Sequence, residues 1–156
     1  MSLRELLDGE TVAALPIRSA ITSESGTVVR AAVARMRDKR IGCAVVVGPR
    51  QKPIGIFTER SLLRVLVQGA SLDERPVGDF ADFRCAVVAQ SDSIAMVWSA
   101  IQDDGARFVC VVDGNGRVVG LTGQRGMSEF LSECFPQQVA VQRIGGTPWF
   151  QQREGA

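Results

Sequence analysis

The stretch GIFTERSLL (Gly55–Leu63) has a second, altered copy in the chain, GLTGQRGMS (Gly120–Ser128). The two copies lie 65 residues apart, and the same offset aligns residues 26–62 with residues 91–127 without a gap. Repetition at one fixed offset indicates that one structural unit is written twice. The repeat therefore has to be interpreted before any single motif.

Each copy predicts the same order of elements. Apolar residues recur at helical spacing in Val29, Ala32, Val33 and Met36, with charged residues between them. A short valine-rich run follows, CAVVVG in the first unit and FVCVVDG in the second, as expected for a buried strand. A turn, a second strand and a second helix complete the unit, and DGNG is a strong hairpin signal.

This order predicts an α/β fold of two tandem α-β-β-α units. A unit of about 55 residues buries too little surface to be stable alone, so the two should pack together with pseudo-twofold symmetry. We place the units at residues 15–70 and 81–135, joined by a linker at 71–80 that has one helical turn after Pro76. Residues 1–14 should form a capping helix, with Ser2 and Glu5 as its capping box. Residues 136–156 are expected to be a tail.

Composition and charge exclude several classes of protein. The chain has 156 residues, 46% of them hydrophobic, and a net charge of +1, which argues against a dedicated nucleic-acid binder. No apolar run is long enough to cross a membrane, and the acidic N-terminal stretch does not resemble a signal peptide. Residues 30–64 hold nine basic and two acidic residues, whereas residues 65–104 hold seven acidic and two basic ones. Solvated helix faces, a phosphate-attracting first half and complementary surfaces in an oligomer all fit this asymmetry.

The residue types also argue against an enzyme. The chain has no histidine, which excludes Ser-His-Asp and Cys-His catalysis and removes the commonest transition-metal ligand. Its four cysteines lack tight ligand spacing, so we expect free thiols in a reducing cytoplasm and no metal site. DGNG could belong to a calcium loop, but the remaining ligands of such a loop are missing.

The motif at Gly55 has a physical interpretation of its own. Gly55 has no Cβ and would let a ligand approach the backbone closely. Thr58 stands at a predicted helix N-terminus, which suits a phosphate, and Arg60 on the first turn can pair with phosphate oxygens. The alternative for Thr58 is a simple helix N-cap.

These residues resemble a known family. Two tandem units with a G-h-h-T-x-R pattern at the exit of the second strand (h, apolar) look like a pair of CBS (cystathionine β-synthase) domains, also called a Bateman module. The resemblance covers about residues 15–135 and is most specific in residues 41–63. It implies a regulatory module that binds AMP, ADP, ATP or S-adenosylmethionine between the two units and commonly dimerises.

The chain departs from the family pattern where the ribose would bind. The family has an aspartate three residues after the threonine, whereas this chain has Ser61 in the first unit and Gly126 in the second. The second unit also has Gly123 in place of the threonine, although Arg125 matches Arg60. We therefore predict that Gly55, Thr58, Arg60, Ser61 and Arg125 face phosphate or ribose, and that the second site is empty or structural.

The resemblance also implies contacts with the adenine base. By position these are Ile21, Thr22 and Cys43 in the first unit, and Ala86, Val87 and Phe108 in the second. Packing in the core is the alternative for all six.

Two functions follow as expectations. The first is a cytoplasmic regulatory module without a required cofactor, which binds an adenosyl ligand, forms a homodimer and signals to an unknown protein in trans. The second is a degenerate CBS pair that binds no nucleotide and serves as a dimerisation or docking platform. In the tail, Trp149 and Phe150 are typical of residues that anchor interfaces, and a disordered end is the alternative.

Overall fold

The computed structural model describes residues 2–135. The first unit contains β1 (Thr22–Glu24), α2 (Val29–Lys39), β2 (Cys43–Val47), β3 (Pro53–Thr58) and α3 (Glu59–Val67). The second contains β4 (Ala86–Ala89), α4 (Ile94–Gln102), β5 (Phe108–Val112), β6 (Val118–Gly123) and α5 (Gln124–Cys134). Helix α1 (Leu3–Gly9) and the short 3₁₀ helices η1 (Val12–Ala14), η2 (Pro49–Gln51) and η3 (Val77–Asp79) complete the described chain. None of the helices in residues 2–135 is both long and apolar enough to span a membrane.

Each unit has a three-stranded mixed sheet. In the first, β1 pairs with β2 in parallel and β2 pairs with β3 antiparallel; in the second, β4, β5 and β6 repeat this arrangement. The α/β class and the two repeated units are confirmed, but each unit begins with a strand that the sequence analysis did not predict. These strands have only three and four residues. Thr22–Glu24 is polar, so it lacks the pattern of a buried strand, whereas the apolar run Ala86–Ala89 is short.

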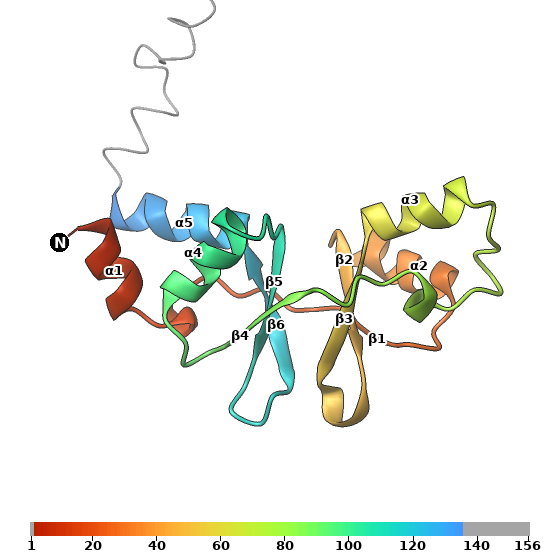
Figure 1. Cartoon of the computed structure of the whole chain (residues 1–156), viewed down its shortest axis with the longest axis horizontal. Helices are drawn as coiled ribbons and strands as arrows, with labels where there is room; N and C mark the ends of the chain where they lie inside the picture. The colour runs from red at the N-terminus through yellow and green to blue at the C-terminus, as the bar shows by residue number, and fades with distance from the viewer. Residues whose placement is uncertain (1, 136–156) are drawn as a thin grey trace, which may run out of the picture.

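The two sheets face each other at the centre, with helices on their outer faces (Figure 1). Along β2, Cys43, Val45 and Val47 point towards the second sheet, while Ala44 and Val46 point towards α2 and α3. The alternation of a strand therefore supplies two cores from one apolar run. Both antiparallel pairs carry a register shift at equivalent positions, Val46/Val47 and Val111/Val112, as the pseudo-twofold repeat predicts.

The segments that precede the units cross between them. Helix α1 and η1 pack into the core of the second unit, whereas η3 in the predicted linker packs into the core of the first (Figure 1). Two isolated bridges mark the crossings symmetrically, Thr11 with Ser93 and Val28 with Pro76. Each unit thus completes its core with chain from outside its own repeat, which ties the two units into one folded body.

Gly55 and Gly120 leave room for these crossing segments. A Cβ at Gly55 would lie 3.1 Å from the Asp82 carbonyl oxygen and 3.1 Å from the Phe83 ring. A Cβ at Gly120 would lie 2.6 Å from the Arg18 carbonyl oxygen. The repeated glycine is therefore explained by close approach of protein backbone, and Gly55 does not line a cleft.

The N-terminal helix begins as predicted. The Ser2 hydroxyl accepts a hydrogen bond from the Glu5 amide, and the Glu5 carboxylate accepts one from the Ser2 amide at 2.7 Å. This capping box satisfies two backbone donors at the start of α1. The predicted tail, with Trp149 and Phe150, lies outside the described residues.

Candidate functional site

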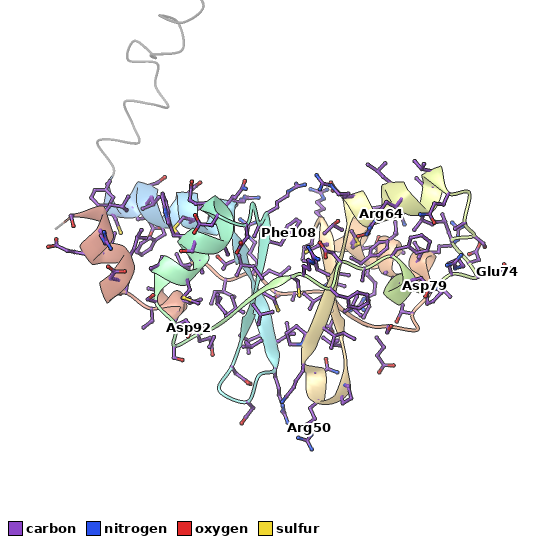
Figure 2. All side chains as sticks on the ribbon, in the orientation of Figure 1. Arg50, Arg64, Glu74, Asp79, Asp92 and Phe108 are labelled. Carbon is purple, nitrogen blue, oxygen red and sulfur yellow. The ribbon has the colours of Figure 1, made fainter. Side chains whose placement is uncertain are left out.

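A cleft of about 890 Å³, here called cleft 1, lies between the two units. One wall is the start of α3, and the other is formed by residues 82–86 and 104–108 of the second unit. In Figure 2, Phe108 lies in the space between the sheets and Arg64 lies at α3. The residues that line cleft 1 are Ile56, Thr58, Glu59, Arg60, Ser61, Arg64, Asp82, Arg84, Cys85, Ala86, Asp104, Gly105, Ala106, Arg107 and Phe108.

Thr58 and Ser61 form a capping box at the start of α3. The Ser61 amide donates to the Thr58 hydroxyl at 3.3 Å, and the Thr58 amide donates to the Ser61 hydroxyl at 3.0 Å. Thr58 is thus the helix N-cap, which was the alternative interpretation of this residue. Because both amides already have partners, anion attraction here depends mainly on side-chain cations and on the helix dipole.

The charged lining of cleft 1 consists of four arginines and three carboxylates. Arg60 and Arg64 come from α3, and Arg84 and Arg107 come from the opposite wall. Arg107 forms an ion pair with Glu59 at 3.7 Å, and Arg64 donates to the Phe80 carbonyl oxygen, a neutral acceptor. Asp82 and Asp104 also line the cleft, but in residues 2–135 neither forms an ion pair with any of these arginines. The geometry therefore presents guanidinium groups that an anionic ligand can engage.

The opposite side of cleft 1 offers an apolar surface. Ala86, Ala106 and the half-buried Phe108 ring lie there, and the Arg107 guanidinium is 5.2 Å from the centroid of that ring. Aromatic and small apolar groups suit the face of a planar base. The structure therefore brings Ala86 and Phe108 of the second unit together with Thr58, Arg60 and Ser61 of the first.

The other predicted residues do not line cleft 1. Ile21 and Cys43 are buried in the core, and the Thr22 carbonyl oxygen accepts a hydrogen bond from Arg35. Val87 is exposed on β4, outside the lining of both clefts. Ile21 and Cys43 are thus core residues, the alternative to a contact with the base, and Val87 faces solvent.

A second cleft of about 590 Å³, here called cleft 2, is related to the first by the repeat. It lies at the start of α5 and is lined by Pro16, Arg18, Ser19, Arg40, Ile41, Gly42, Glu59, Arg107, Phe108, Leu121, Thr122, Gly123, Gln124, Arg125, Gly126 and Ser128. Arg125 is therefore separated from the other predicted phosphate residues. Glu59, Arg107 and Phe108 line both clefts and form the partition between them.

Packing explains the two glycines at the start of α5. A Cβ at Gly123 would lie 2.3 Å from the Arg107 carbonyl oxygen, and one at Gly126 would lie 2.5 Å from the Thr122 hydroxyl. The ribose-binding aspartate of the family pattern therefore has no space at position 126. The Thr122 hydroxyl is buried and has no hydrogen-bond partner in residues 2–135.

Three cysteines lie near the contact between the two sheets. Burial raises the pKa of Cys43 and of Cys110 to about 12, and burial also raises the pKa of Cys85 at the edge of cleft 1. Thiols with a raised pKa stay protonated at neutral pH and are poor nucleophiles. In residues 2–135 no group of three or more Cys, Asp or Glu side chains is placed to hold a metal ion.

Comparison with known proteins identifies the architecture. A CBS domain protein from Pyrobaculum aerophilum, solved in complex with AMP, superimposes with a TM-score of 0.69 at 22% identity, over 85% of this chain and 97% of that one. The CBS domain pair of protein MJ0100, solved with 5′-methylthioadenosine and S-adenosyl-L-methionine, gives a TM-score of 0.69 at 18% identity, over 80% and 98%. The chain has the fold of a CBS-domain pair.

Sequence comparison supports the same assignment in the first unit. The family model of the CBS domain matches residues 12–68. An uncharacterized protein of Methanopyrus kandleri is 33% identical over 88 residues, which is 56% of this chain and 45% of that protein. This chain thus spans less than half of that relative. The second unit carries the altered copy of the motif, and the fold and the 65-residue offset identify it as a repeat of the first.

Sequence reasoning missed several residues of cleft 1. Arg64 is one helical turn beyond Arg60 on α3, so helical spacing could have found it. Arg84 and Arg107 come from the second unit, and only the packing of the two units against each other brings them opposite α3. The one signal for Arg107 in the sequence is its position next to Phe108 at the start of a strand.

Proposed function

We propose that the CBS pair is a regulatory module that binds an adenine nucleotide or a related adenosyl ligand in cleft 1. The observation that carries the proposal is the pairing of two walls across one cleft. Guanidinium groups of Arg60 and Arg64 lie on the α3 side, and the Phe108 ring with Ala86 lies on the other. The neighbours solved with AMP and with S-adenosyl-L-methionine support an adenosyl ligand.

In this proposal the phosphate of the ligand faces the arginines and its base lies against Phe108. The ribose has only Ser61, which is 1% exposed and already accepts a hydrogen bond from Thr58. Losing a charged hydrogen bond costs about 1.5–3 kcal/mol, roughly ten- to a hundredfold in affinity. Phosphate contacts therefore have to supply more of the binding energy than in a site with the aspartate.

Regulation follows from the position of cleft 1 between the two units. A ligand that contacts both units shifts their packing only as far as it binds one arrangement better than another. We propose that such a shift is transmitted to a partner protein in trans, from a homodimer in the cytoplasm. No catalytic role is assigned to the chain.

Isothermal titration with AMP, ADP, ATP and S-adenosylmethionine tests the proposal. We expect about one ligand per chain at micromolar affinity, and roughly tenfold weaker binding in Arg60→Gln. Thr58→Ser keeps the cap and should bind as the wild type does, so it controls for the helix start. The assignment of the site is contradicted if none of the four ligands binds at millimolar concentration, or if Arg60→Gln binds with the affinity of the wild type.

One observation favours the second candidate, a CBS pair that serves as a dimerisation or docking platform. The hydroxyls of Thr58 and Ser61 are both engaged in the capping box, while Leu63, Leu66 and Val67 expose apolar surface on α3. Analytical ultracentrifugation at increasing salt tests this candidate. If complementary charge holds a dimer together, the dimer weakens as salt rises; a dimer indifferent to ionic strength indicates apolar contacts.

A further inference from the structure

At one repeated position the two units carry opposite charges. Arg64 on α3 and Glu129 on α5 are 65 residues apart and occupy equivalent places one turn into their helices. Each reaches towards the segment that crosses from outside its own repeat. Arg64 presents a positive charge to that segment and Glu129 a negative one, so the charge at this position is opposite in the two units.

Glu129 holds two of the cations that line cleft 2. Its Oε1 atom lies 3.0 Å from Arg18 Nη2 and 3.1 Å from Arg125 Nε. Arg18 lies on the crossing segment and Arg125 on the first turn of α5, so one carboxylate joins the two walls of the cleft. Carboxylate oxygens and phosphate oxygens accept the same bonds from guanidinium groups.

Cleft 1 has no such internal anion at the equivalent position. Arg60, which matches Arg125, has no ion pair in residues 2–135, and Arg64 has only the Phe80 carbonyl oxygen. In cleft 2, three of the four guanidinium groups are paired with carboxylates, Arg18 and Arg125 with Glu129 and Arg107 with Glu59. Arg40 is the fourth.

We infer that Glu129 is an internal substitute for the anionic group of a ligand. Its carboxylate occupies Arg18 and Arg125 and so suppresses anion binding in cleft 2. The inference rests on the proposed function, because it takes cleft 1 as the site that binds an anionic nucleotide. It assigns the one-sided binding to a specific ion-pair network, whereas the missing ribose clamp alone would weaken both clefts.

The rest of cleft 2 is still suited to a polar ligand. Thr122 lines the cleft, although its unpartnered hydroxyl is buried, and Gly123 gives α5 no side-chain cap. An uncapped helix start favours an anion through its free amides and its dipole. Neutralising Glu129 should therefore uncover a site whose other parts are already in place.

Titration of the Glu129→Gln variant with AMP tests the inference. Exposed ion pairs are weak, so releasing both arginines should raise the affinity of cleft 2 roughly three- to thirtyfold. We expect a second AMP per chain at concentrations where the wild type binds one. Glu133→Gln is the matched control, because it makes the same change one turn later on α5, at an exposed residue without an ion pair in residues 2–135. This control should keep one site.

A double variant locates the new site. Adding Arg125→Gln to Glu129→Gln should remove the second binding event and leave the first. The inference is overturned if the wild type and Glu133→Gln already bind two AMP with similar affinity, or if a folded Glu129→Gln chain gains no second site. A wild type that binds no AMP contradicts the function proposed for cleft 1. The role of Glu129 is then tested separately: it is supported if Glu129→Gln gains an AMP site and overturned if it gains none.

Discussion

Gly120→Ala should destabilise the chain far more than alanine at Gly55 or Gly114, because Gly120 lies where a crossing segment meets β6. The new Cβ would lie 2.4 Å from Ile17 Cγ2 and 2.6 Å from the Arg18 carbonyl oxygen. Real Cβ contacts are never this short, so the segment has to move. Two backbone hydrogen bonds depend on its position, Arg18 N–H to Leu121 O at 2.9 Å and Leu121 N–H to Arg18 O at 2.8 Å.

The magnitude follows from these contacts. Weakening two backbone hydrogen bonds costs about 1–3 kcal/mol, and forced repacking costs about as much again. Alanine also lowers the entropy of the unfolded chain, which offsets about 0.4–1 kcal/mol of this loss. We therefore expect the free energy of unfolding to fall by about 2–4 kcal/mol, a large share of the roughly 5–15 kcal/mol of a typical domain.

Urea denaturation of three variants measures the effect. Gly114→Ala has no atom within 4 Å of the new Cβ and should be neutral or slightly stabilising. Gly55→Ala meets atoms at 3.1 Å, among them the exposed Phe83 ring, which can move, and should cost about 1 kcal/mol. If Gly120→Ala lost no more stability than Gly114→Ala, the packing of the crossing segment against β6 would be wrong.

Two further predictions concern stability. Between about pH 9 and 12 the free energy of unfolding should fall by up to about 1.4 kcal/mol per pH unit for each of Cys43 and Cys110. The unfolded thiols lose their protons above about pH 9, whereas the folded ones keep theirs to about pH 12. In urea unfolding, a variant with both cysteines replaced by alanine should lose stability less steeply with pH. The same pH dependence in both proteins would contradict the burial of the thiols. Thr58→Ala should lower the unfolding free energy by about 1–2 kcal/mol and Thr58→Ser by much less, because only alanine removes the N-cap oxygen. If thermal denaturation showed equal losses of stability in both variants, Thr58 would not act as the N-cap.

The repeat made most of the fold predictable. One offset fixed the equivalence of the units, and the valine-rich runs at β2 and β5 identified the central strands. Strands β1 and β4 escaped prediction because they are short, and Thr22–Glu24 shows no apolar alternation. The crossing of η1 and η3 between units was also out of reach, since a local pattern does not show which core an apolar turn enters.

The site was predictable where the motif is local. Thr58, Arg60 and Ser61 are neighbours on one helix start, and the structure places them in one cleft. The positions of Arg84 and Arg107 in the cleft depend on which surfaces the two units turn towards each other. Gly55 was given a ligand-binding role because a glycine beside a binding motif and a glycine beside a crossing backbone are identical in sequence.

A crystal structure of the chain grown with saturating AMP would test the central claim most directly. We predict AMP in cleft 1, with its phosphate within hydrogen-bonding distance of Arg60 and its base against Phe108, and cleft 2 without nucleotide while Glu129 still holds Arg18 and Arg125. AMP bound in cleft 2 alone, or absent from both clefts, would contradict the function proposed for this chain.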